Sequence, residues 1–181
     1  MKIVDRKFTE ENKKEILEAI KNGKIFIYPT DTIYGIGGDA TNADSVKKIR
    51  EIKQRDIKPF SVIAPSMKWI EDNCFLNENS KEQLKKLPGP YTFFLNLKNK
   101  KCVSEEVNPL NNSVGIRIPK HWFADFVKES GVPFITTSVN LSGKSFMTKL
   151  EDLNNEIKNS VDYIIYEGEN AGKESEKIDL R

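Results

Sequence analysis

Short apolar runs alternate with amphipathic segments along most of the chain, and this alternation constrains the fold more than any other feature. The runs have the length of buried strands, whereas the segments between them repeat apolar residues at helical spacing. The predicted strands cover residues 25–28, 60–64, 92–97, 114–118, 134–137 and 163–166. Repeated exchange of strands and helices predicts an α/β fold with a mixed sheet, and 181 residues suffice for one such domain.

The helices expected between these strands have recognisable ends. Thr9 is a candidate N-cap for a helix that runs to Asn22 and closes at Gly23, and Asn42 or Asp44 can begin a second helix. Further helices are expected over residues 66–69, 79–87, 121–130 and 149–157. Residues 168–181 are polar and weakly patterned, so the single domain 1–181 is expected to end in a short loop or tail, either folded over a ligand or frayed.

The charge of the chain is nearly balanced, with 29 basic and 27 acidic residues and a net charge of +2. A domain that binds nucleic acid tightly usually has a larger basic excess, so an extended RNA-binding face is disfavoured, whereas a local basic cleft for a small anion is allowed. No run approaches the roughly 18 apolar residues of a membrane span, and the N-terminus lacks the apolar core of a signal peptide. We therefore expect a cytoplasmic protein that binds no membrane.

Cysteine and histidine are scarce. Cys74 and Cys102 form no C-x-x-C pair, which indicates neither a zinc site nor a disulfide framework. His121 is the only histidine, which excludes a multi-histidine metal site. Any chemistry must therefore rest mainly on Lys, Arg, Ser, Thr, Asn and carboxylate side chains.

Residues 24–38 combine a strand exit with polar side chains and glycines. Pro29 ends the hydrogen-bond ladder of the preceding strand, and Thr30, Asp31 and Thr32 then line a loop that leads into glycines. Hydroxyls and a carboxylate at the mouth of a strand suit a small-ligand site at a sheet edge. An ordinary strand-to-loop exit accounts for this segment equally well.

Lys53 and Arg55 lie two residues apart near the end of a predicted helix. The sequence from Asp56 to Pro59 indicates that the helix has ended, and in an extended segment both cations would point to the same side. They could then bind one anion. A solvated helix end is the alternative, because cations also suit the C-terminal end of a helix dipole.

Ser138 and Asn140 follow a predicted strand and would share one face of an extended chain. Asn140 offers both a donor and an acceptor, and the bend at Ser142 and Gly143 can expose backbone N–H groups to phosphates. Turn formation by the Ser and Asn side chains at the strand end is the alternative.

Arg117 lies inside the apolar strand over residues 114–118, where an arginine is costly to bury unless it is paired with an anion. Its guanidinium could bind a carboxylate of a ligand through two hydrogen bonds. An internal salt bridge to an Asp or Glu explains its position with comparable weight.

Five segments, in this order along the chain, resemble the signature of the YrdC-like threonylcarbamoyl-AMP synthases. They are Pro-Thr-Asp-Thr-Ile-Tyr-Gly-Ile from Pro29, Lys53-Gln-Arg55, Leu-Pro-Gly-Pro-Tyr-Thr from Leu87, Arg117-Ile-Pro119, and Thr-Ser-Val-Asn-Leu-Ser-Gly from Thr137. The resemblance implies a single YrdC-like α/β domain, with a twisted, mixed parallel and antiparallel sheet flanked by helices and a concave cleft.

The resemblance also implies a reaction. Enzymes of this family are nucleotidyltransferases that join L-threonine, bicarbonate or CO2, and ATP into threonylcarbamoyl-AMP and release pyrophosphate. The product serves the threonylcarbamoyl modification of the tRNA adenosine next to the anticodon. Magnesium is expected to accompany ATP, with no tightly bound organic cofactor, and downstream tRNA threonylcarbamoyl-transferase machinery is the expected partner. Binding of tRNA by the chain itself is expected to be weak.

Residue by residue, the resemblance assigns roles to this chain. The catalytic set is Lys53, Arg55, Ser138 and Asn140. Thr32, Arg117 and Thr137 are assigned to threonine. The assigned ATP contacts are Lys53, Arg55, Lys58, Ser113, Ser138, Asn140 and Ser175, and no protein metal site is expected.

Three departures from the family pattern stand out. Val139 replaces the usual alanine, Asp56 replaces the proline after Lys-x-Arg, and the chain ends soon after Ser175-Glu-Lys-Ile-Asp179, where Ser-Thr-Ile-Val-Asp is usual. The closing strand of the family is therefore expected to be short or absent. Two other functions stay open: an RNA-binding module of the same fold, and a paralogue with another carbamoyl-transfer or hydrolytic role.

Overall fold

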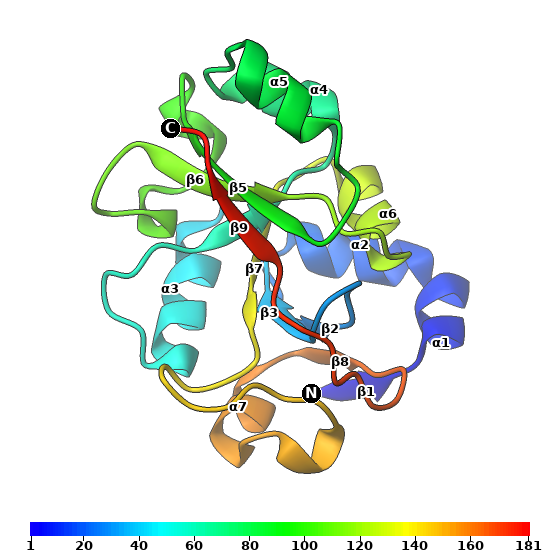
Figure 1. Ribbon diagram of the computed structural model, residues 1–181. Helices are drawn as coiled ribbons and strands as arrows, with labels where there is room; N and C mark the ends of the chain where they lie inside the picture. Colours follow the sequence, from blue (N-terminus) through cyan, green and yellow to red (C-terminus); the bar gives the residue numbers. More distant parts are fainter.

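A computed structural model describes all residues 1–181, and its strands form one mixed sheet in the order β1-β8-β2-β3-β7-β4-β6-β5-β9 (Figure 1). The neighbours β1–β8, β2–β8, β4–β6 and β5–β9 are parallel, and the other four pairs are antiparallel. The strands are β1 (Lys2–Val4), β2 (Phe26–Tyr28), β3 (Gly35–Gly37), β4 (Ser61–Ile63), β5 (Tyr91–Asn96), β6 (Ser113–Arg117), β7 (Phe134–Ser138), β8 (Tyr163–Ile165) and β9 (Glu176–Asp179). The predicted α/β class and mixed sheet are confirmed.

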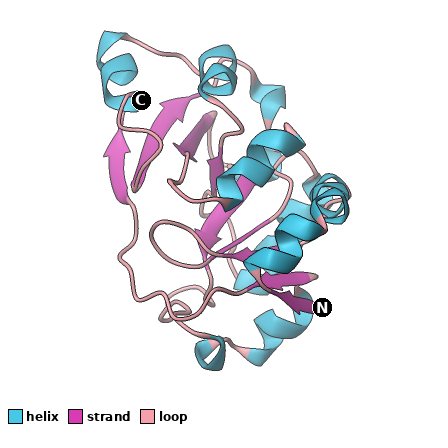
Figure 2. Ribbon diagram, turned by 90° about the vertical axis from the view of Figure 1, so that its right-hand side faces the viewer, coloured by secondary structure: helices cyan, strands magenta, loops and turns pink.

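Helices cover the sheet, and the side chains between helices and strands form two apolar clusters. The helices are α1 (Arg6–Glu11), α2 (Lys13–Lys21), α3 (Ala43–Lys53), α4 (Met67–Asn73), α5 (Glu78–Leu84), α6 (Phe123–Ser130) and α7 (Asn155–Ser160), with 3-10 turns η1 (Lys100–Cys102), η2 (Glu105–Val107) and η3 (Leu150–Asp152). The smaller cluster packs α2 and α6 against β2, β7 and β8, and the larger one includes α3, β3, β4, β5 and β6. In Figure 2, β9 and the loop before it stand apart from the stacked helices on the other side of the strands. No helix is long and apolar enough to cross a membrane.

The first helix begins earlier than the sequence predicts. Asp5, not Thr9, is the N-cap, and its carboxylate accepts a hydrogen bond of 2.7 Å from the Phe8 N–H. Thr9 is buried inside α1, and its hydroxyl donates to the Asp5 carbonyl. The expected single helix is also divided at Asn12, so the prediction of one helix from Thr9 to Asn22 is wrong.

Other helix ends follow their caps. Asn42 caps α3, because its side chain accepts hydrogen bonds from the N–H groups of Asp44 and Ser45. The helix predicted over residues 149–157 is replaced by η3 and the short helix α7. Asn154 provides the N-cap that places the start of α7 later than expected.

Strand β3 lies in a segment that the sequence predicts as a glycine-ended loop. It pairs antiparallel with both β2 and β7 and is fully buried. A Cβ on Gly37 would lie 1.8 Å from the Ile135 carbonyl oxygen, and a Cβ on Gly35 would lie 2.9 Å from the Tyr28 ring. Glycine is therefore required here by the close approach of neighbouring strands, and the loop interpretation of these residues is wrong.

The C-terminal segment is more ordered than a loop or tail. Residues Glu176–Asp179 form β9, which pairs in parallel with β5 over four residues. Upstream, the Tyr34 hydroxyl donates to the Gly168 carbonyl at 2.6 Å, and the Asn170 N–H donates to Thr148. The expectation of a short closing strand is confirmed, whereas the expectation of an unstructured end is wrong for residues 176–179.

Substituting Gly37 tests the packing requirement at β3. We expect Gly37→Ala to destabilise the fold by about 3 kcal/mol and to lower Tm by roughly 6–12 °C, because the Ile135 carbonyl belongs to a paired strand and cannot move aside. Gly38→Ala is the matched control, since a Cβ there would lie 3.1 Å from Ile25 Cδ1 and 3.2 Å from the Lys24 carbonyl oxygen, so its neighbours would have to shift far less than the Ile135 carbonyl would. Equal Tm values for the two variants in thermal unfolding would contradict this account.

Candidate active site

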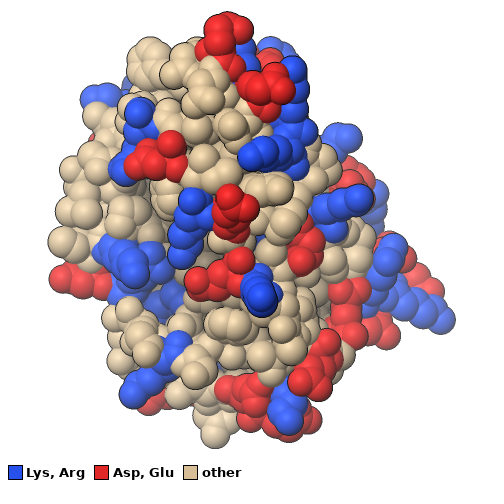
Figure 3. Space-filling model, viewed as in Figure 1, with Lys and Arg blue, Asp and Glu red and all other residues tan.

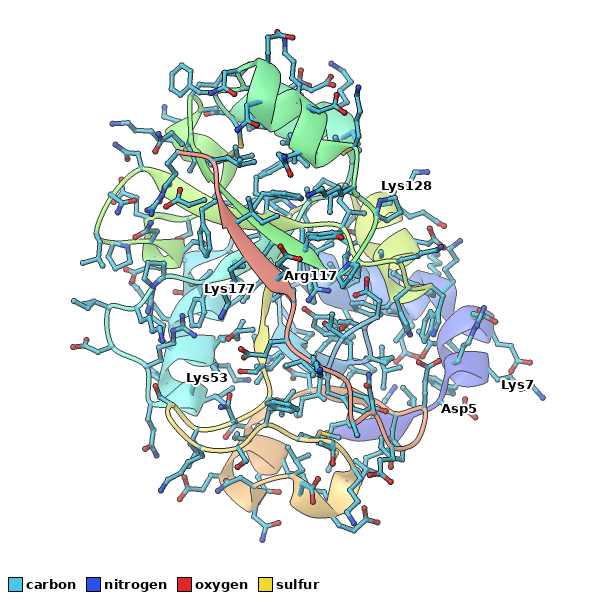
Figure 4. The ribbon with its side chains drawn as sticks, viewed as in Figure 1. Asp5, Lys7, Lys53, Arg117, Lys128 and Lys177 are labelled. Atoms are coloured by element: carbon cyan, nitrogen blue, oxygen red, sulfur yellow. The ribbon has the colours of Figure 1, made fainter.

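A polar cavity of about 240 Å³ opens between β3, the end of α3, β6, the end of β7 and the C-terminal segment. Figure 4 shows Lys53 near the end of α3, Lys177 on β9, and Arg117 beside β9. Nine of the ten residues to which the family resemblance assigns a role line the cavity: Thr32, Lys53, Arg55, Lys58, Arg117, Thr137, Ser138, Asn140 and Ser175. The fold thus brings together residues from segments that lie far apart in the chain.

Lys53 is the last residue of α3, and its side chain is only 2% exposed. The next residue, Gln54, has a φ of 48° and ends the helix in the left-handed conformation. The Lys53 Nζ donates to the carbonyl oxygens of Ser138 and Asn140 and to the Asn140 side-chain oxygen. The Ser142 N–H donates in turn to the Lys53 carbonyl at 3.0 Å. Lys53 therefore ties the end of α3 to the Ser138–Asn140 segment through both its side chain and its backbone.

The environment of Lys53 makes its ammonium unusually easy to deprotonate. Burial lowers its pKa to about 7, and the nearby positive charges of Arg55 and Lys58 act in the same direction, whereas Glu174 opposes them. No carboxylate forms an ion pair with the Nζ, and its partners are neutral oxygens. An anion entering the cavity would therefore stabilise the charged form of Lys53.

Ser138 and Asn140 face each other, as the sequence predicts for an extended segment. The Ser138 hydroxyl donates to the Asn140 side-chain oxygen at 2.7 Å, and the Asn140 amide donates to the Lys144 carbonyl at 2.6 Å. The same hydrogen bonds form the turn at the strand end that the sequence analysis gave as the alternative to a ligand site. The turn and the cavity wall are the same segment.

Arg55 lies beyond the end of α3, so the expected change from helix to extended chain is present. Its Nε donates to the Lys58 carbonyl at 3.0 Å, its Nη2 donates to the Pro59 carbonyl, and its Nη1 donates to the Thr137 hydroxyl at 3.3 Å. Burial, followed by the charge of Arg50, lowers the pKa of Arg55 to about 10, which still leaves it charged at neutral pH. Arg55 is thus a fixed cation in the cavity wall.

Arg117 is held by a residue of the β2–β3 loop. Its Nη2 lies 2.6 Å from the Asp31 carboxylate, and its Nη1 donates to the Thr32 hydroxyl at 3.1 Å. The other Asp31 oxygen accepts from the Lys120 N–H. Arg117 Nε is the one fully buried side-chain polar atom without a hydrogen-bond partner. The internal salt bridge is therefore real, and it orients a guanidinium that also lines the cavity.

The C-terminal segment supplies wall residues that the sequence analysis did not single out. Glu174 and Lys177 line the cavity and form an ion pair, with 3.6 Å between Lys177 Nζ and Glu174 Oε2. Ser175 joins the wall by a hydrogen bond of 2.7 Å between its hydroxyl and that of Thr92. No local sequence signal marks Glu174 and Lys177, because pairing of β9 with β5 decides where they lie.

Ser113 is the one predicted ATP contact that the fold does not bring to this cavity. It is the first residue of β6, and its hydroxyl donates to the Asn111 side chain at 2.6 Å. It borders an adjoining depression of about 210 Å³ together with Asp179 and Arg181, and this depression shares Pro59 and Lys177 with the cavity. The remaining predicted site residues share one cavity.

The cavity carries more positive than negative charge. Lys53, Arg55, Lys58, Arg117 and Lys177 line it, against Glu174 in the wall and Asp31 behind Arg117. Across the face shown in Figure 3, Lys and Arg side chains are interspersed with Asp and Glu and do not form one basic surface. No group of three or more His, Cys, Asp or Glu side chains is placed to hold a metal ion. The local excess suits a small, multiply charged anion.

Comparison with known proteins identifies relatives of this chain. The Sua5–YciO–YrdC family model, described as "Telomere recombination", matches residues 18–181. A Methanocaldococcus jannaschii protein assigned as a threonylcarbamoyl-AMP synthase is 39% identical over 163 residues, covering 86% of this chain and 75% of that protein. The threonylcarbamoyl-AMP synthase of Vibrio campbellii is 28% identical, covering 90% of each chain.

A solved structure supports the same relationship. The crystal structure of P. abyssi Sua5 complexed with L-threonine superposes with a TM-score of 0.87 at 29% identity and covers 98% of this chain. This chain spans 53% of the length of that protein.

The pKa of Lys53 predicts a specific pH dependence of stability. Because the folded-state pKa is about 7 and the ordinary value is 10.5, the unfolded chain binds more protons between these values, so this group makes folding more favourable as pH rises through that range. We expect the free energy of unfolding of the wild type to rise by about 2 kcal/mol relative to that of Lys53→Met between pH 7 and pH 9. Urea unfolding at both pH values measures this difference.

The exposed Lys47, on the same helix, provides the control for this measurement. Lys47→Met removes a lysine whose side chain is 56% exposed, so its stability should follow that of the wild type between the two pH values. If Lys53→Met also follows the wild type, then Lys53 does not titrate in this range.

Proposed function

Because the chain belongs to the Sua5–YciO–YrdC family, we propose that it is a threonylcarbamoyl-AMP synthase, a nucleotidyltransferase that joins L-threonine, bicarbonate or CO2, and ATP and releases pyrophosphate. The observation that carries the proposal is the convergence of Lys53, Arg55, Ser138, Asn140 and Arg117 on one polar cavity. These residues come from three separate segments of the family signature, and each retains the residue type that the signature requires.

The reaction matches a cavity without a cysteine or histidine nucleophile. The threonine amine nitrogen bonds to the carbon of CO2 and loses a proton to give a carbamate, and if bicarbonate is the source, water is also released. A carbamate oxygen then attacks the α-phosphorus of ATP, and the bond from that phosphorus to the pyrophosphate oxygen breaks. The substrate thus supplies the nucleophile and ATP supplies the leaving group. The protein has to hold several anionic groups together and to stabilise the charge that develops at phosphorus.

Fixed cations and donors suit that task. Arg55 is immobilised by three acceptors, so its charge requires little reorganisation when the phosphates arrive. Lys53, Lys58 and the Ser138 and Asn140 side chains add charge and hydrogen bonds on the same wall, and Ser175 faces them from the C-terminal segment. Ser113 borders the adjoining depression, which shares Pro59 and Lys177 with the cavity, and its assignment to ATP stays a prediction.

Magnesium fits the nucleotide side of the cavity. Mg²⁺ is usually bound by one or two carboxylates together with substrate phosphates and water. Glu174 is the one acidic side chain among the cavity-lining residues, so it would supply that carboxylate beside the phosphates. The ion would neutralise phosphate charge and would arrive with ATP.

The threonine side of the cavity is assigned to Arg117, Thr32 and Thr137. Asp31 holds one end of the Arg117 guanidinium, so the group is oriented before a ligand carboxylate arrives. The P. abyssi relative was solved with L-threonine, which supports a threonine site in the shared domain. The product would feed the tRNA threonylcarbamoyl-transferase machinery in the cytoplasm, and the near-neutral net charge is consistent with weak tRNA binding by this chain.

Pyrophosphate release tests the proposed reaction. The folded protein, given ATP, magnesium, bicarbonate and threonine, should release pyrophosphate in a threonine-dependent manner. Arg55→Ala should lower this turnover by about 10²-fold, because it removes a preorganised charge-stabilising donor. Release that is equal with and without threonine would overturn the assignment.

Arg117→Lys tests the division between the two substrates. Lysine keeps the positive charge but cannot reproduce the two-pronged contact, so the apparent KM for threonine should rise about tenfold or more while that for ATP stays nearly unchanged. Because Asp31 would lose a buried partner, Tm of the variant must be measured first. An equal loss of affinity for both substrates in a stably folded variant would contradict this assignment.

A further inference from the structure

Arg50 lies on α3, one turn before Lys53, and does not line the cavity. Its guanidinium nevertheless binds the segment between α3 and β4 that carries Arg55 and Lys58. Nothing in the sequence pattern distinguishes Arg50 from the other charged residues of α3. Its contacts do.

All three nitrogens of the Arg50 guanidinium donate to main-chain carbonyls. Nη1 donates to the Asp56 carbonyl at 2.5 Å and to the Lys58 carbonyl at 3.1 Å. Nε and Nη2 donate to the Glu106 carbonyl in η2, at 2.9 and 2.6 Å. One planar group therefore joins the 54–59 loop to a second, well-packed segment, a geometry that suits the rigid fork of arginine.

The same loop has few other restraints. Backbone hydrogen bonds hold its two ends, from the Arg55 N–H to the Arg50 carbonyl and from the Phe60 N–H to the Val107 carbonyl. Between them, the Asp56 N–H donates to no group of the chain and its side chain is exposed. The middle of the loop therefore depends on side-chain donors, which are Arg50 at the Asp56 and Lys58 carbonyls and Arg55 at the Lys58 and Pro59 carbonyls.

Phe60 links Arg50 to the cavity cation. The guanidinium carbons of Arg50 and Arg55 lie 4.6 and 4.7 Å from the centre of the Phe60 ring. Arg55 also donates to the Lys58 and Pro59 carbonyls, so both arginines bind the same short stretch of backbone. A loop that moved away from Arg50 would take the acceptors of Arg55 with it.

We propose that Arg50 is a positioning residue, which shapes the 54–59 loop so that Arg55 and Lys58 face the cavity. Asp56 lies in the middle of the loop, and its carbonyl oxygen accepts a hydrogen bond from Arg50 Nη1 at 2.5 Å, whereas its own N–H has no partner in the chain. A side-chain contact thus supplies a restraint that the local backbone lacks.

Hydrogen exchange tests the proposal without any enzyme assay. In Arg50→Lys, the hydrogen-bonded amides at the two ends of the loop, those of Arg55 and Phe60, should exchange about tenfold faster than in the wild type, because lysine cannot bind the loop and η2 together. Lys47→Gln is the matched control: it lies one turn earlier on α3 and pairs with the Glu106 side chain, not with the loop. Its loop amides should exchange as in the wild type.

A second variant separates positioning from general destabilisation. Asp56→Pro, added to Arg50→Lys, should return the exchange of the neighbouring amides toward the wild-type rate, because the ring restores the missing backbone restraint. If Arg50→Lys lowers Tm strongly, this double variant decides the question. The proposal would be overturned if the double variant recovered neither the exchange rate of the loop amides nor Tm. It would also be overturned if a stably folded Arg50→Lys exchanged its loop amides at the wild-type rate.

The activity measurement rests on the proposed function. There, Arg50→Lys should raise the apparent KM for ATP about tenfold, or about 1.4 kcal/mol, and leave that for threonine unchanged. In an Arg55→Ala background the same substitution should have a smaller effect, because Arg50 acts partly through Arg55. Full additivity of the two substitutions would contradict the positioning role. Absence of threonine-dependent turnover would instead count against the proposed function and leave the exchange result standing.

Discussion

The buried ammonium of Lys53, bonded to three oxygens of the Ser138–Asn140 segment, joins the two halves of the cavity. α3 carries Lys53 to this point, and β7 delivers the segment that receives it. Because the partners are neutral oxygens and the side chain is almost fully buried, the charge is costly in the empty cavity and favoured by an anion. The electrostatics of the cavity therefore favour an anion.

The basic side chains around the cavity are held by different kinds of partner, and the kind of partner decides how much positive charge each side chain keeps. Arg117 is held by a carboxylate on a neighbouring loop, and Arg55 is held by backbone carbonyls and the face of an aromatic ring. Carbonyl acceptors position a guanidinium without neutralising it, whereas Asp31 offsets part of the Arg117 charge. Arg55 therefore offers more uncompensated positive charge to the cavity than Arg117 does.

Gly37 and the C-terminal strand β9 determine how the cavity is enclosed. Gly37 lets β3 approach Ile135 closely enough to place the β2–β3 loop against Arg117, and the Tyr34 hydroxyl fastens the start of the C-terminal segment. Pairing of β9 with β5 then carries Glu174 and Ser175 to the cavity wall. The enclosure depends on contacts between residues more than 80 positions apart, so its stability belongs to the sheet as a whole.

The sequence by itself determined the α/β class, most strands and most of the residues that meet in the cavity. These features are local: strand and helix periods, the breaks at Pro29 and at residues 56–59, and side-chain types such as Lys53 and Arg55 are visible within a few residues. Tertiary structure alone decided that Asp31 binds Arg117, that Gly35–Gly37 is a strand, that Ser113 lies elsewhere, and that Arg50 shapes the 54–59 loop. Each of these depends on which distant backbone or side-chain atom comes within a few ångströms, and a one-dimensional pattern does not specify that proximity.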